Sequence, residues 1–238
     1  MKIALLGYGK MGKAIESIAI ERGHEVVLKI NSRNLETLTI QNLKTADVAI
    51  EFSTPDYVLS NIKICLQAGT PIAVGTTGWH GNKTEVYSQV KKLNGSFLAA
   101  SNFSIGVNIF FELNRRLAEL MSNQESYTSE IQEIHHTEKI DSPSGTAITL
   151  AEEIINHNST YSSWENKAST KKEAIEIISY REPDVPGTHE VTYSSNIDII
   201  SIKHQARNRK GFALGAVLAA EYIQTKKGIF SMQDVLKN

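Results

Sequence analysis

Residues 133–147, EIHHTEKIDSPSGTA, gather side chains that could carry acid–base or ligand-binding chemistry. His135 and His136 are adjacent, Lys139 follows, and Ser144-Gly145-Thr146 open an apolar pattern typical of a helix. These residue types are compatible with a metal site, an anion site, a proton donor or a polar loop without chemistry.

Adjacent histidines are poorly placed to share one metal ion. If this segment is a strand, His135 and His136 point to opposite faces of the sheet. Neither an H-E-x-x-H spacing nor a pair of cysteines accompanies them. We therefore expect no metal site here.

An anion site and a proton donor both fit the residues that remain. A helix that begins at Ser144-Gly145-Thr146 presents free backbone N–H groups, which bind carboxylates or phosphates. The histidines and Lys139 add positive potential, although Ser144 could simply cap the helix. Histidine titrates near neutral pH and can donate a proton, but histidine pairs also serve as structural hydrogen-bonding groups. The residues alone leave these alternatives open.

A second candidate site lies at the N-terminus, where LLGYGKMGKAI places glycines in G-x-G-x-x-G register between a strand and a helix. Gly7 permits a tight turn, Gly9 lets the backbone approach a pyrophosphate, and Gly12 lets the helix pack closely on the strand. N–H groups at the helix start then face the phosphates. We interpret this loop as a dinucleotide site.

The residue expected to hold the adenosine ribose lies roughly 20 positions further on, where NAD-binding proteins carry Asp or Glu. This chain has Lys29 at that place, followed by Asn31, Ser32 and Arg33. Because Lys29 or Arg33 could pair with a 2′-phosphate, the sequence favours NADPH. The alternative is that Lys29 is a solvated charge at the end of a strand.

Two further segments follow predicted strands and so lie at the carboxyl edge of a sheet, where such folds bind ligands. GTTGW, residues 75–79, has small residues that would let a nicotinamide ring approach the backbone, although it could equally be a simple turn. ASNFSIGVN, residues 100–108, opens a helix and is a plausible second wall of the same cleft.

The elements that must position these residues form two groups. In the first hundred residues, short apolar strands are each followed by a helix, a pattern that predicts a parallel sheet covered on both faces. Strands are predicted at residues 2–7, 25–30, 47–52, 71–78 and 96–101. Residues 31–46 are too few for a full additional helix and strand, so we expect an abbreviated sheet there.

After Ser101 the pattern changes to one long helix, isolated strands and a second helix. Predicted helices cover residues 104–121, 144–157 and 211–225, and predicted strands cover residues 127–136, 173–180, 189–195 and 198–205. We expect a mixed or antiparallel sheet with helices on one face, a polar loop near residues 156–172, and a last helix that returns to the first domain. The predicted fold class is α/β, a Rossmann-type parallel sheet domain with an inserted α+β domain.

Composition narrows the class of protein. The chain has 238 residues, 41% hydrophobic, with a formal net charge of -1, so no basic surface suggests nucleic acid as a partner. No apolar run approaches the roughly 20 residues that a membrane helix needs, and the N-terminus reads as a strand rather than a signal peptide. The single cysteine, Cys65, suits a reducing compartment. We therefore expect a cytoplasmic protein.

The histidine segment resembles the motif E-x-H-H-x-x-K-x-D-x-P-S-G-T-A of the 4-hydroxy-tetrahydrodipicolinate reductase (dihydrodipicolinate reductase) family. GYGKMG, VGTTGW, ASNFSIGVN, GTHEVTY, HQARNRKGFALGA and GIFSMQDVL also resemble segments of that family, in the same order. The resemblance thus extends along nearly the whole chain.

This resemblance implies a dinucleotide-binding domain of residues 1–103 and 213–238, and an inserted domain of residues 104–212 that binds substrate and mediates formation of a homotetramer. It implies reduction of 4-hydroxy-tetrahydrodipicolinate, a small-molecule dicarboxylate, to tetrahydrodipicolinate with NADPH or NADH in bacterial lysine and diaminopimelate biosynthesis. The alternative is another Rossmann-fold NAD(P)-dependent oxidoreductase that acts on an amino-acid-derived substrate.

By the same resemblance, His135 is the acid/base residue and Lys139 a proton donor, His136 contacts substrate, and Gly145 and Thr146 bind a substrate carboxylate. Expected cofactor contacts are Gly7, Tyr8, Gly9, Lys10, Met11, Gly12, Lys29, Gly75, Thr76, Thr77, Ala100, Ser101, Asn102 and Phe103. A cationic loop ahead of a helix suits a cyclic dicarboxylate, and an acid must quench the negative charge that hydride transfer creates.

The chain departs from the family pattern in a few places. Its glycine loop is one residue shorter than the common form, with Lys10 in place of arginine, and Lys29 replaces a common acidic residue. Pro183 stands where the family usually has glycine. Most of these differences lie on the adenosine side and concern cofactor preference.

Overall fold

The computed structural model describes residues 1–168, 171–208 and 210–237. The chain divides into two compact units, and each is considered by itself. The first unit comprises Met1–Ile105 and Lys210–Asn238, and the second comprises Gly106–Arg209. Within the described residues, no helix combines the length and apolar character required to cross a membrane.

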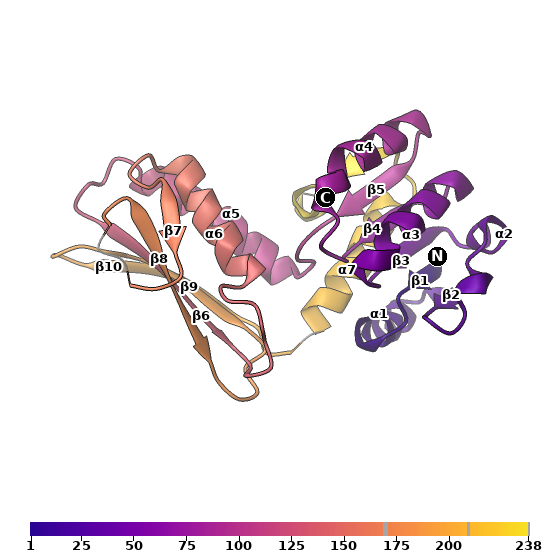
Figure 1. The fold of residues 1–238 in the computed structure, drawn as a ribbon, viewed down its shortest axis with the longest axis horizontal. Coiled ribbons are helices and arrows are strands. Elements are labelled where there is room, and N and C mark those ends of the chain that lie inside the picture. Colours follow the sequence, from indigo (N-terminus) through magenta and orange to yellow (C-terminus); the bar gives the residue numbers. More distant parts are fainter. Residues whose placement is uncertain (169–170, 209, 238) are drawn as a thin grey trace. The chain divides into compact units, whose positions relative to one another are not determined.

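A six-stranded sheet forms the centre of the first unit (Figure 1). Its strands are β1 (Lys2–Leu6), β2 (Glu25–Ile30), β3 (Val48–Glu51), β4 (Ile72–Val74), β5 (Ser96–Ala99) and β11 (Gly228–Phe230). They lie in the order β11-β5-β4-β3-β1-β2, and every neighbouring pair is parallel. The chain runs from β1 outward to β2 and then returns to β3 on the other side of β1, so the carboxyl ends of these strands flank a topological switch point.

Helices cover both faces of this sheet, and residues of β1 alternate between two cores. Ile3 and Leu5 pack in one core, while Ala4 and Leu6 pack in the other. The first core receives α1 and α7, and the second receives α3 and α4. The helices of this unit are α1 (Lys10–Glu21), α2 (Ile40–Leu43), α3 (Pro55–Ala68), α4 (Lys83–Lys92), α7 (Lys210–Ile223) and α8 (Met232–Leu236), with 3₁₀ turns η1 (Leu35–Thr37) and η2 (His80–Asn82).

The predicted Rossmann-type sheet is confirmed, with one strand that the pattern missed. Between β2 and β3 the described chain forms only η1 and α2, which agrees with the abbreviation expected from its length. The additional strand, β11, has three residues and pairs with β5. A strand so short has too few residues to show a period in the sequence.

The second unit has a five-stranded mixed sheet in the order β10-β9-β6-β8-β7. Its strands are β6 (Thr128–His135), β7 (Ser163–Glu165), β8 (Ala174–Arg181), β9 (Thr188–Ser194) and β10 (Ile199–Gln205). Strand β6 pairs in parallel with β8 and antiparallel with β9, and alternate residues of β6 are buried. This mixed sheet confirms the predicted α+β character of the second part of the chain.

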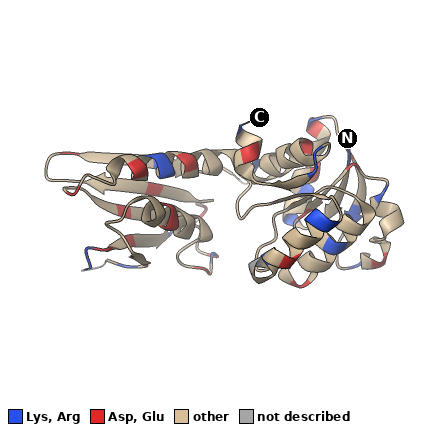
Figure 2. Ribbon diagram, turned by 90° about the horizontal axis from the view of Figure 1, so that it is seen from above, with Lys and Arg blue, Asp and Glu red and all other residues tan. Residues whose placement is uncertain are grey.

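Helices α5 (Ile105–Met121) and α6 (Gly145–His157) pack on one face of that sheet. Their contacts include Phe110 and Met121 of α5, and Leu150 and Ile154 of α6, against β-strand residues such as Val191. Figure 1 shows both helices beside the sheet, and Figure 2 shows basic and acidic positions interspersed along the elements of each unit. That mixture matches the formal net charge of -1.

The polar stretch near residues 156–172 was expected to be a loop, and this expectation is wrong in part. Helix α6 continues to His157, and β7 adds a parallel edge strand beside β8. Trp164 in β7 lies against the core of the second unit, which explains why a mostly polar segment is ordered there. Residues 169–170 of the expected loop lie outside the described residues.

Candidate functional site

The glycine loop lies between β1 and α1, and its backbone requires glycine at two of the three positions. Gly7 has a φ of 100°, and a Cβ there would lie 2.1 Å from the carbonyl oxygen of Phe52. A Cβ on Gly12 would lie 2.5 Å from the carbonyl oxygen of Gly7. A Cβ on Gly9 would meet nothing within 4 Å, so this glycine borders open space where a ligand could approach the backbone.

A cleft of about 340 Å³ opens beside this loop. Its lining comes from the residues that follow three neighbouring strands: Gly7, Tyr8 and Gly9 after β1; Ile30, Asn31 and Ser32 at the end of β2; and Phe52, Ser53 and Thr54 after β3. This is the switch point at which doubly wound sheets bind dinucleotides. The structure therefore places the first predicted cofactor segment, Gly7 to Gly9, in a cleft suited to an adenosine and its pyrophosphate.

Lys29, the predicted adenosine-side cation, is held by its own unit. Its Nζ lies 2.5 Å from Oε1 of Glu16 and 5.3 Å from the centre of the Tyr8 ring. The Tyr8 hydroxyl also donates a hydrogen bond to Glu16. The hydrogen bond with Glu16 raises the pKa of Lys29, and hydrogen bonds from Lys29 and Tyr8 lower the pKa of Glu16. Lys29 is thus a cation with a carboxylate partner beside the glycine loop.

The remaining predicted cofactor residues surround the ends of β4 and β5. A second hollow, of about 90 Å³, is lined in part by Thr76, Thr77, Ala100 and Ser101. Oγ1 of Thr76 is buried there without a hydrogen-bond partner among the described residues. A bound carboxamide could satisfy this orphaned hydroxyl, and the arrangement therefore fits a nicotinamide cofactor.

Close packing also surrounds Gly75 and Phe103, two further predicted cofactor residues. A Cβ on Gly75 would lie 2.3 Å from the Phe52 ring, and the Phe52 and Phe103 rings are 5.4 Å apart. Phe103 is buried, and Gly215 of α7 approaches it so closely that a Cβ would lie 1.7 Å from its carbonyl oxygen. Of the other predicted cofactor residues, Lys10 is exposed, Met11 packs partly buried against the core, and Asn102 is half-buried.

In the second unit, the predicted anion site is the start of α6. Ser144 is the N-cap, and its Oγ accepts a hydrogen bond from the backbone N–H of Ala147. A Cβ on Gly145 would meet nothing within 4 Å, so the first turn is accessible beside this residue. Thr146 follows in the same turn. The prediction that Ser144 caps a helix is confirmed, and the open first turn remains available to a carboxylate.

Lys139 lies on the loop between β6 and α6, where it has an acidic partner. Its Nζ donates to both carboxylate oxygens of Asp141, at 2.7 and 2.8 Å. Arg181 of β8 holds the same loop by donating to the carbonyl oxygens of Lys139 at 3.3 Å and Asp141 at 2.7 Å. Burial would raise the pKa of Asp141, but the hydrogen bond and the charge of Lys139, together with a backbone hydrogen bond, outweigh it, and the pKa is lowered. The loop therefore keeps a charged lysine near the end of β6.

The two adjacent histidines occupy different surroundings. His135 is the last residue of β6 and is buried, whereas His136 follows the strand and is half-buried. Nδ1 of His136 has no hydrogen-bond partner among the described residues. That nitrogen is itself buried, whereas His135 faces other protein groups.

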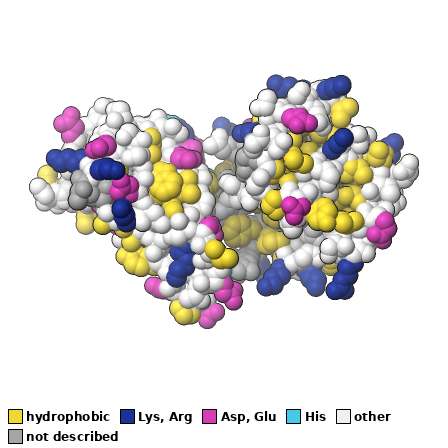
Figure 3. All heavy atoms as spheres, in the orientation of Figure 1, with side chains coloured by type: hydrophobic (Ala, Val, Ile, Leu, Met, Phe, Trp, Pro, Cys, Tyr) yellow, Lys and Arg dark blue, Asp and Glu magenta, His cyan; other side chains and the backbone are white. Residues whose placement is uncertain are grey.

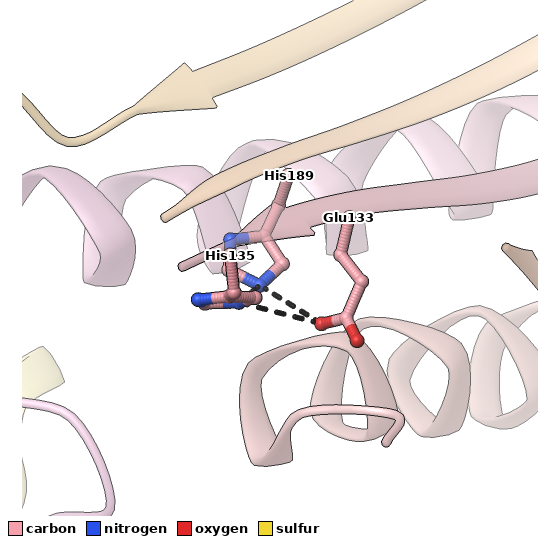
Figure 4. Close-up of side chains that lie close together, drawn as sticks. All are labelled: Glu133, His135 and His189. Atoms are coloured by element: carbon pink, nitrogen blue, oxygen red, sulfur yellow. Dashed lines mark hydrogen bonds and ion pairs between the residues drawn. The ribbon is translucent and has the colours of Figure 1, made fainter. Parts of the chain in front are cut away.

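Sequence reasoning missed two residues that contact His135. Figure 4 shows Glu133 of β6 and His189 of β9 gathered with it. The Nε2 atoms of His135 and His189 lie 3.2 Å apart, and each lies 3.5 Å from Oε2 of Glu133. Alternation along β6 could have placed Glu133 beside His135. His189 could not be found in this way, because it enters through the register of β9, where it lies opposite Glu133.

The buried Glu133 carboxylate is ionised. Its two oxygens accept from the backbone N–H of Ser144 at 3.0 and 3.2 Å, and one also accepts from Oγ of Ser179 at 2.7 Å. Burial alone would raise the pKa of Glu133, but the neighbouring His135 and His189 rings and the hydrogen bonds from Ser144 and Ser179 together outweigh it, and the pKa lies far below its ordinary value. Burial lowers the pKa of His189, which therefore stays neutral at physiological pH.

Glu133, His135 and His189 bring ligand-type atoms within 4.8 Å of one another. Such spacing is compatible with either a metal ion or a hydrogen-bonded cluster. Each of the three side chains has hydrogen-bonding or ion-pair partners within the protein, so hydrogen bonds account for the arrangement. We describe it below as the histidine cluster.

Comparisons with known proteins agree with the architecture. Residues 1–103 match the family description "Dihydrodipicolinate reductase, N-terminus", and residues 106–236 match "Dihydrodipicolinate reductase, C-terminus". The chain is 49% identical over 238 residues to a 4-hydroxy-tetrahydrodipicolinate reductase of Christiangramia forsetii, covering 100% of this chain and 98% of the relative. It is 36% identical to one of Rickettsia rickettsii, covering 96% and 95%.

A solved structure, a dipicolinate-bound dihydrodipicolinate reductase from Paenisporosarcina sp. TG-14, shares the fold. Its TM-score is 0.77 at 22% identity, and the alignment covers 97% of each chain. A glycine loop at the switch point of a parallel sheet, with a second α+β unit inserted in the chain, defines a Rossmann-type oxidoreductase that uses NADH or NADPH. Within that class, this chain belongs to the dihydrodipicolinate reductase family. The family and the reductase activity expected from the sequence are confirmed.

Proposed function

We propose that the chain reduces 4-hydroxy-tetrahydrodipicolinate to tetrahydrodipicolinate in lysine and diaminopimelate biosynthesis, with His135 and Lys139 as its proton-transferring residues. The observation that carries this proposal is the second unit's arrangement. A histidine at the end of β6, a charged lysine on the following loop and an open helix start lie within one short segment, residues 135–146. The family match spans the same residues.

The first unit would hold the cofactor, which supplies a hydride when bound. The turn at Gly7 and the open face at Gly9 would receive the pyrophosphate, and the buried Thr76 hydroxyl would meet the carboxamide. The other predicted contacts, Tyr8, Lys10, Met11, Gly12, Lys29, Gly75, Thr77, Ala100, Ser101, Asn102 and Phe103, would complete these walls.

The second unit would bind the substrate dicarboxylate. The first turn of α6 is open beside Gly145, whose backbone N–H would donate to one carboxylate, and Thr146 is the next predicted contact in the same turn. His136, which directly follows β6 and is half-buried, would contact the substrate beside it. Backbone donors suit this task because they are fixed in place and lose little entropy when the substrate binds.

Proton transfer would fall to His135 and Lys139. Delivery of a hydride to a conjugated ring creates negative charge, which a nearby acid must neutralise. Asp141 holds Nζ of Lys139 by two hydrogen bonds on the loop after β6. His135 would act as the acid/base residue, because imidazole exchanges protons near neutral pH.

The surface of the second unit supports the further proposal that the protein is a homotetramer. Strand β10 is an edge strand, and its apolar residues Ile199 and Ile200 are exposed, as is Ile197 before it. Figure 3 shows hydrophobic side chains grouped on the displayed face of this unit. Exposed edges and apolar patches invite pairing with another chain. We place the protein in the cytoplasm, because its one cysteine is buried and unpaired.

The function is tested by supplying purified protein with NADH or NADPH and the product of the preceding aldolase-type synthase. Oxidation of the cofactor, followed by its absorbance, is the expected result. A protein that consumes neither cofactor would exclude the proposed reaction. Screening dicarboxylates and other amino-acid-derived compounds for thermal stabilisation would then identify the alternative class of substrate.

A further inference from the structure

The histidine cluster contains two residues, Glu133 and His189, for which the proposed reaction has no direct use. Both are buried, with exposed fractions of 0% and 4%. Buried carboxylates and imidazoles are costly unless they are paired. Because both residues contact His135, their role is to be sought in what they do to the His135 ring.

Strand register creates the cluster. Glu133 and His135 are two residues apart on β6, so their side chains share the buried face of the sheet. Glu133 lies directly opposite His189 in the antiparallel β6–β9 pair. The cluster thus rests on two central strands of the sheet rather than on a loop.

The hydrogen-bonding roles within the cluster can be assigned from its surroundings. Burial, and the neighbouring His135 and His204, favour the neutral form of His189. A neutral His189 can accept at Nε2 from the Nε2–H of His135, 3.2 Å away. The Oγ of Ser144 is also close to that Nε2, at 3.1 Å. In this arrangement the second nitrogen of His135, Nδ1, remains for proton exchange.

Among the described residues, these two rings are the nearest protonatable groups to the Glu133 carboxylate, each 3.5 Å from Oε2. Nη1 of Arg181 is 3.8 Å from Oε1 of Glu133, beyond hydrogen-bonding distance, and Arg181 donates instead to the backbone carbonyls of Lys139, Tyr180 and Asp141. The protonatable ring of His135, 3.5 Å from Oε2, is nearer. Charged or titratable groups that act on the cluster from neighbouring elements include His204 on β10 and Asp141 on the loop after β6; His136 and Lys139 lie on the same loop, and Glu130, Glu176, Tyr180 and Glu190 lie on the paired strands.

We infer that Glu133 and His189 are positioning residues for His135: the carboxylate stabilises its imidazolium form, and the neutral ring of His189 fixes its orientation by accepting its Nε2–H. This inference rests on the proposed role of His135 as the acid. Gly187 contributes from the other side, because a Cβ there would lie 3.0 Å from Cε1 of His135. The His135 ring is therefore confined between Glu133 and His189 on one side and the backbone of Gly187, just before β9, on the other.

The test replaces Glu133 with glutamine, which keeps the shape and removes the charge. A buried anion a few ångströms away favours the protonated form of a base. In Glu133→Gln the alkaline limb of the kcat profile should therefore move to lower pH by about one unit or more. At neutral pH kcat should fall by at least about tenfold. This decrease should be smaller than the decrease caused by complete loss of general acid catalysis. KM for the cofactor should stay within about twofold.

Two variants accompany this one. Glu133→Asp keeps the charge and should recover much of the lost turnover and return the alkaline limb toward its original position. Glu125→Gln, in an exposed part of the same unit, should leave both quantities unchanged. NMR of protein whose histidines carry ¹³C at Cε1 follows the protonation of His135 directly. The His135 resonance is assigned as the one that is missing in His135→Gln, and in Glu133→Gln it should titrate at lower pH.

If Glu133→Gln does not fold, His189→Leu carries the test, because leucine has a similar volume but no side-chain atom that can accept the Nε2–H of His135. It should lower kcat and change the pH profile. A folded variant with unchanged kcat, pH profile and His135 titration would overturn the inference. Loss of activity in His135→Gln, together with wild-type behaviour of Glu133→Gln, would leave the proposed function standing. Full activity of His135→Gln would overturn the proposed function itself.

Discussion

The dinucleotide cleft of the first unit and the histidine cluster of the second are built by different means. The cleft is made largely of backbone: the Gly7 turn, the open face at Gly9 and the close approach at Gly75. The cluster is made of side chains, Glu133, His135 and His189, that meet across two strands. A phosphate can be bound by fixed N–H groups, whereas proton transfer needs a group whose protonation can change.

The same contrast appears in the electrostatics. Lys29 beside the glycine loop pairs with Glu16 at a partly exposed site, where water and salt screen the interaction. Glu133 is buried, so its charge must be balanced by hydrogen bonds and by nearby groups. Substitutions in the cluster should therefore act through turnover and pH, and substitutions in the cleft through cofactor binding and backbone strain.

The largest expected effect separates chemistry from cofactor binding. His135→Gln and Lys139→Ala should each reduce kcat by about 10²- to 10⁴-fold, because the proton donor is lost. The dissociation constant for NADH or NADPH, measured by fluorescence titration, should change little. His157→Gln, in α6 of the same unit, is the matched control and should keep its turnover. If cofactor affinity fell as much as kcat, the prediction that the first unit binds the cofactor and the second unit transfers the proton would be wrong.

The second prediction strains the backbone of the cleft. Gly7→Ala adds a Cβ at a position 2.1 Å from the Phe52 carbonyl oxygen, with a φ of 100° that disfavours alanine. The free energy of unfolding should fall by about 1–3 kcal/mol, and cofactor affinity should fall with it. Gly81→Ala, where a Cβ would meet nothing within 4 Å, should change neither. Denaturant titration and fluorescence binding measure the two effects.

The third prediction uses the depressed pKa of Glu133. Because the folded-state pKa is below the unfolded value, the ionised carboxylate contributes stability that is fully present above about pH 5 and is lost as pH falls further. Glu133→Gln lacks this titration. It should be less stable than the wild type by about 1–3 kcal/mol at pH 7, and the difference should narrow at pH 4 and below. A constant difference across that range would exclude a stabilising role of the charge.

The smallest expected effect concerns cofactor choice. Glu16→Gln removes the carboxylate partner of Lys29 and frees its ammonium for a 2′-phosphate. The ratio of KM values for NADPH and NADH should shift toward NADPH by about two- to fivefold, the scale of an exposed ion pair. Glu21→Gln on the same helix is the control. A shift toward NADH, or one that does not weaken at high salt, would indicate that Lys29 does not face the adenosine.

Much of the fold was readable because its determinants are local. The G-x-G-x-x-G register predicted the strand, turn and helix around Gly7, and the apolar strands predicted the parallel sheet. Ser144 was readable as a cap because a cap acts on residues within its own turn. The strands β7 and β11 were missed because neither contains a fully buried apolar run like that of β4, and each is ordered by pairing with a neighbouring strand.

The sequence by itself determined where the glycines turn the backbone, which segments are strands and helices, and that His135, Lys139 and the start of α6 share one segment. Only the tertiary structure decided that His189 lies opposite Glu133, that Lys29 pairs with Glu16, and that Gly187 borders the His135 ring. The physical reason is the separation along the chain of the residues that interact. Turns, caps and strand alternation depend on neighbours along the chain, whereas these contacts depend on strand register and packing between residues that only folding brings together.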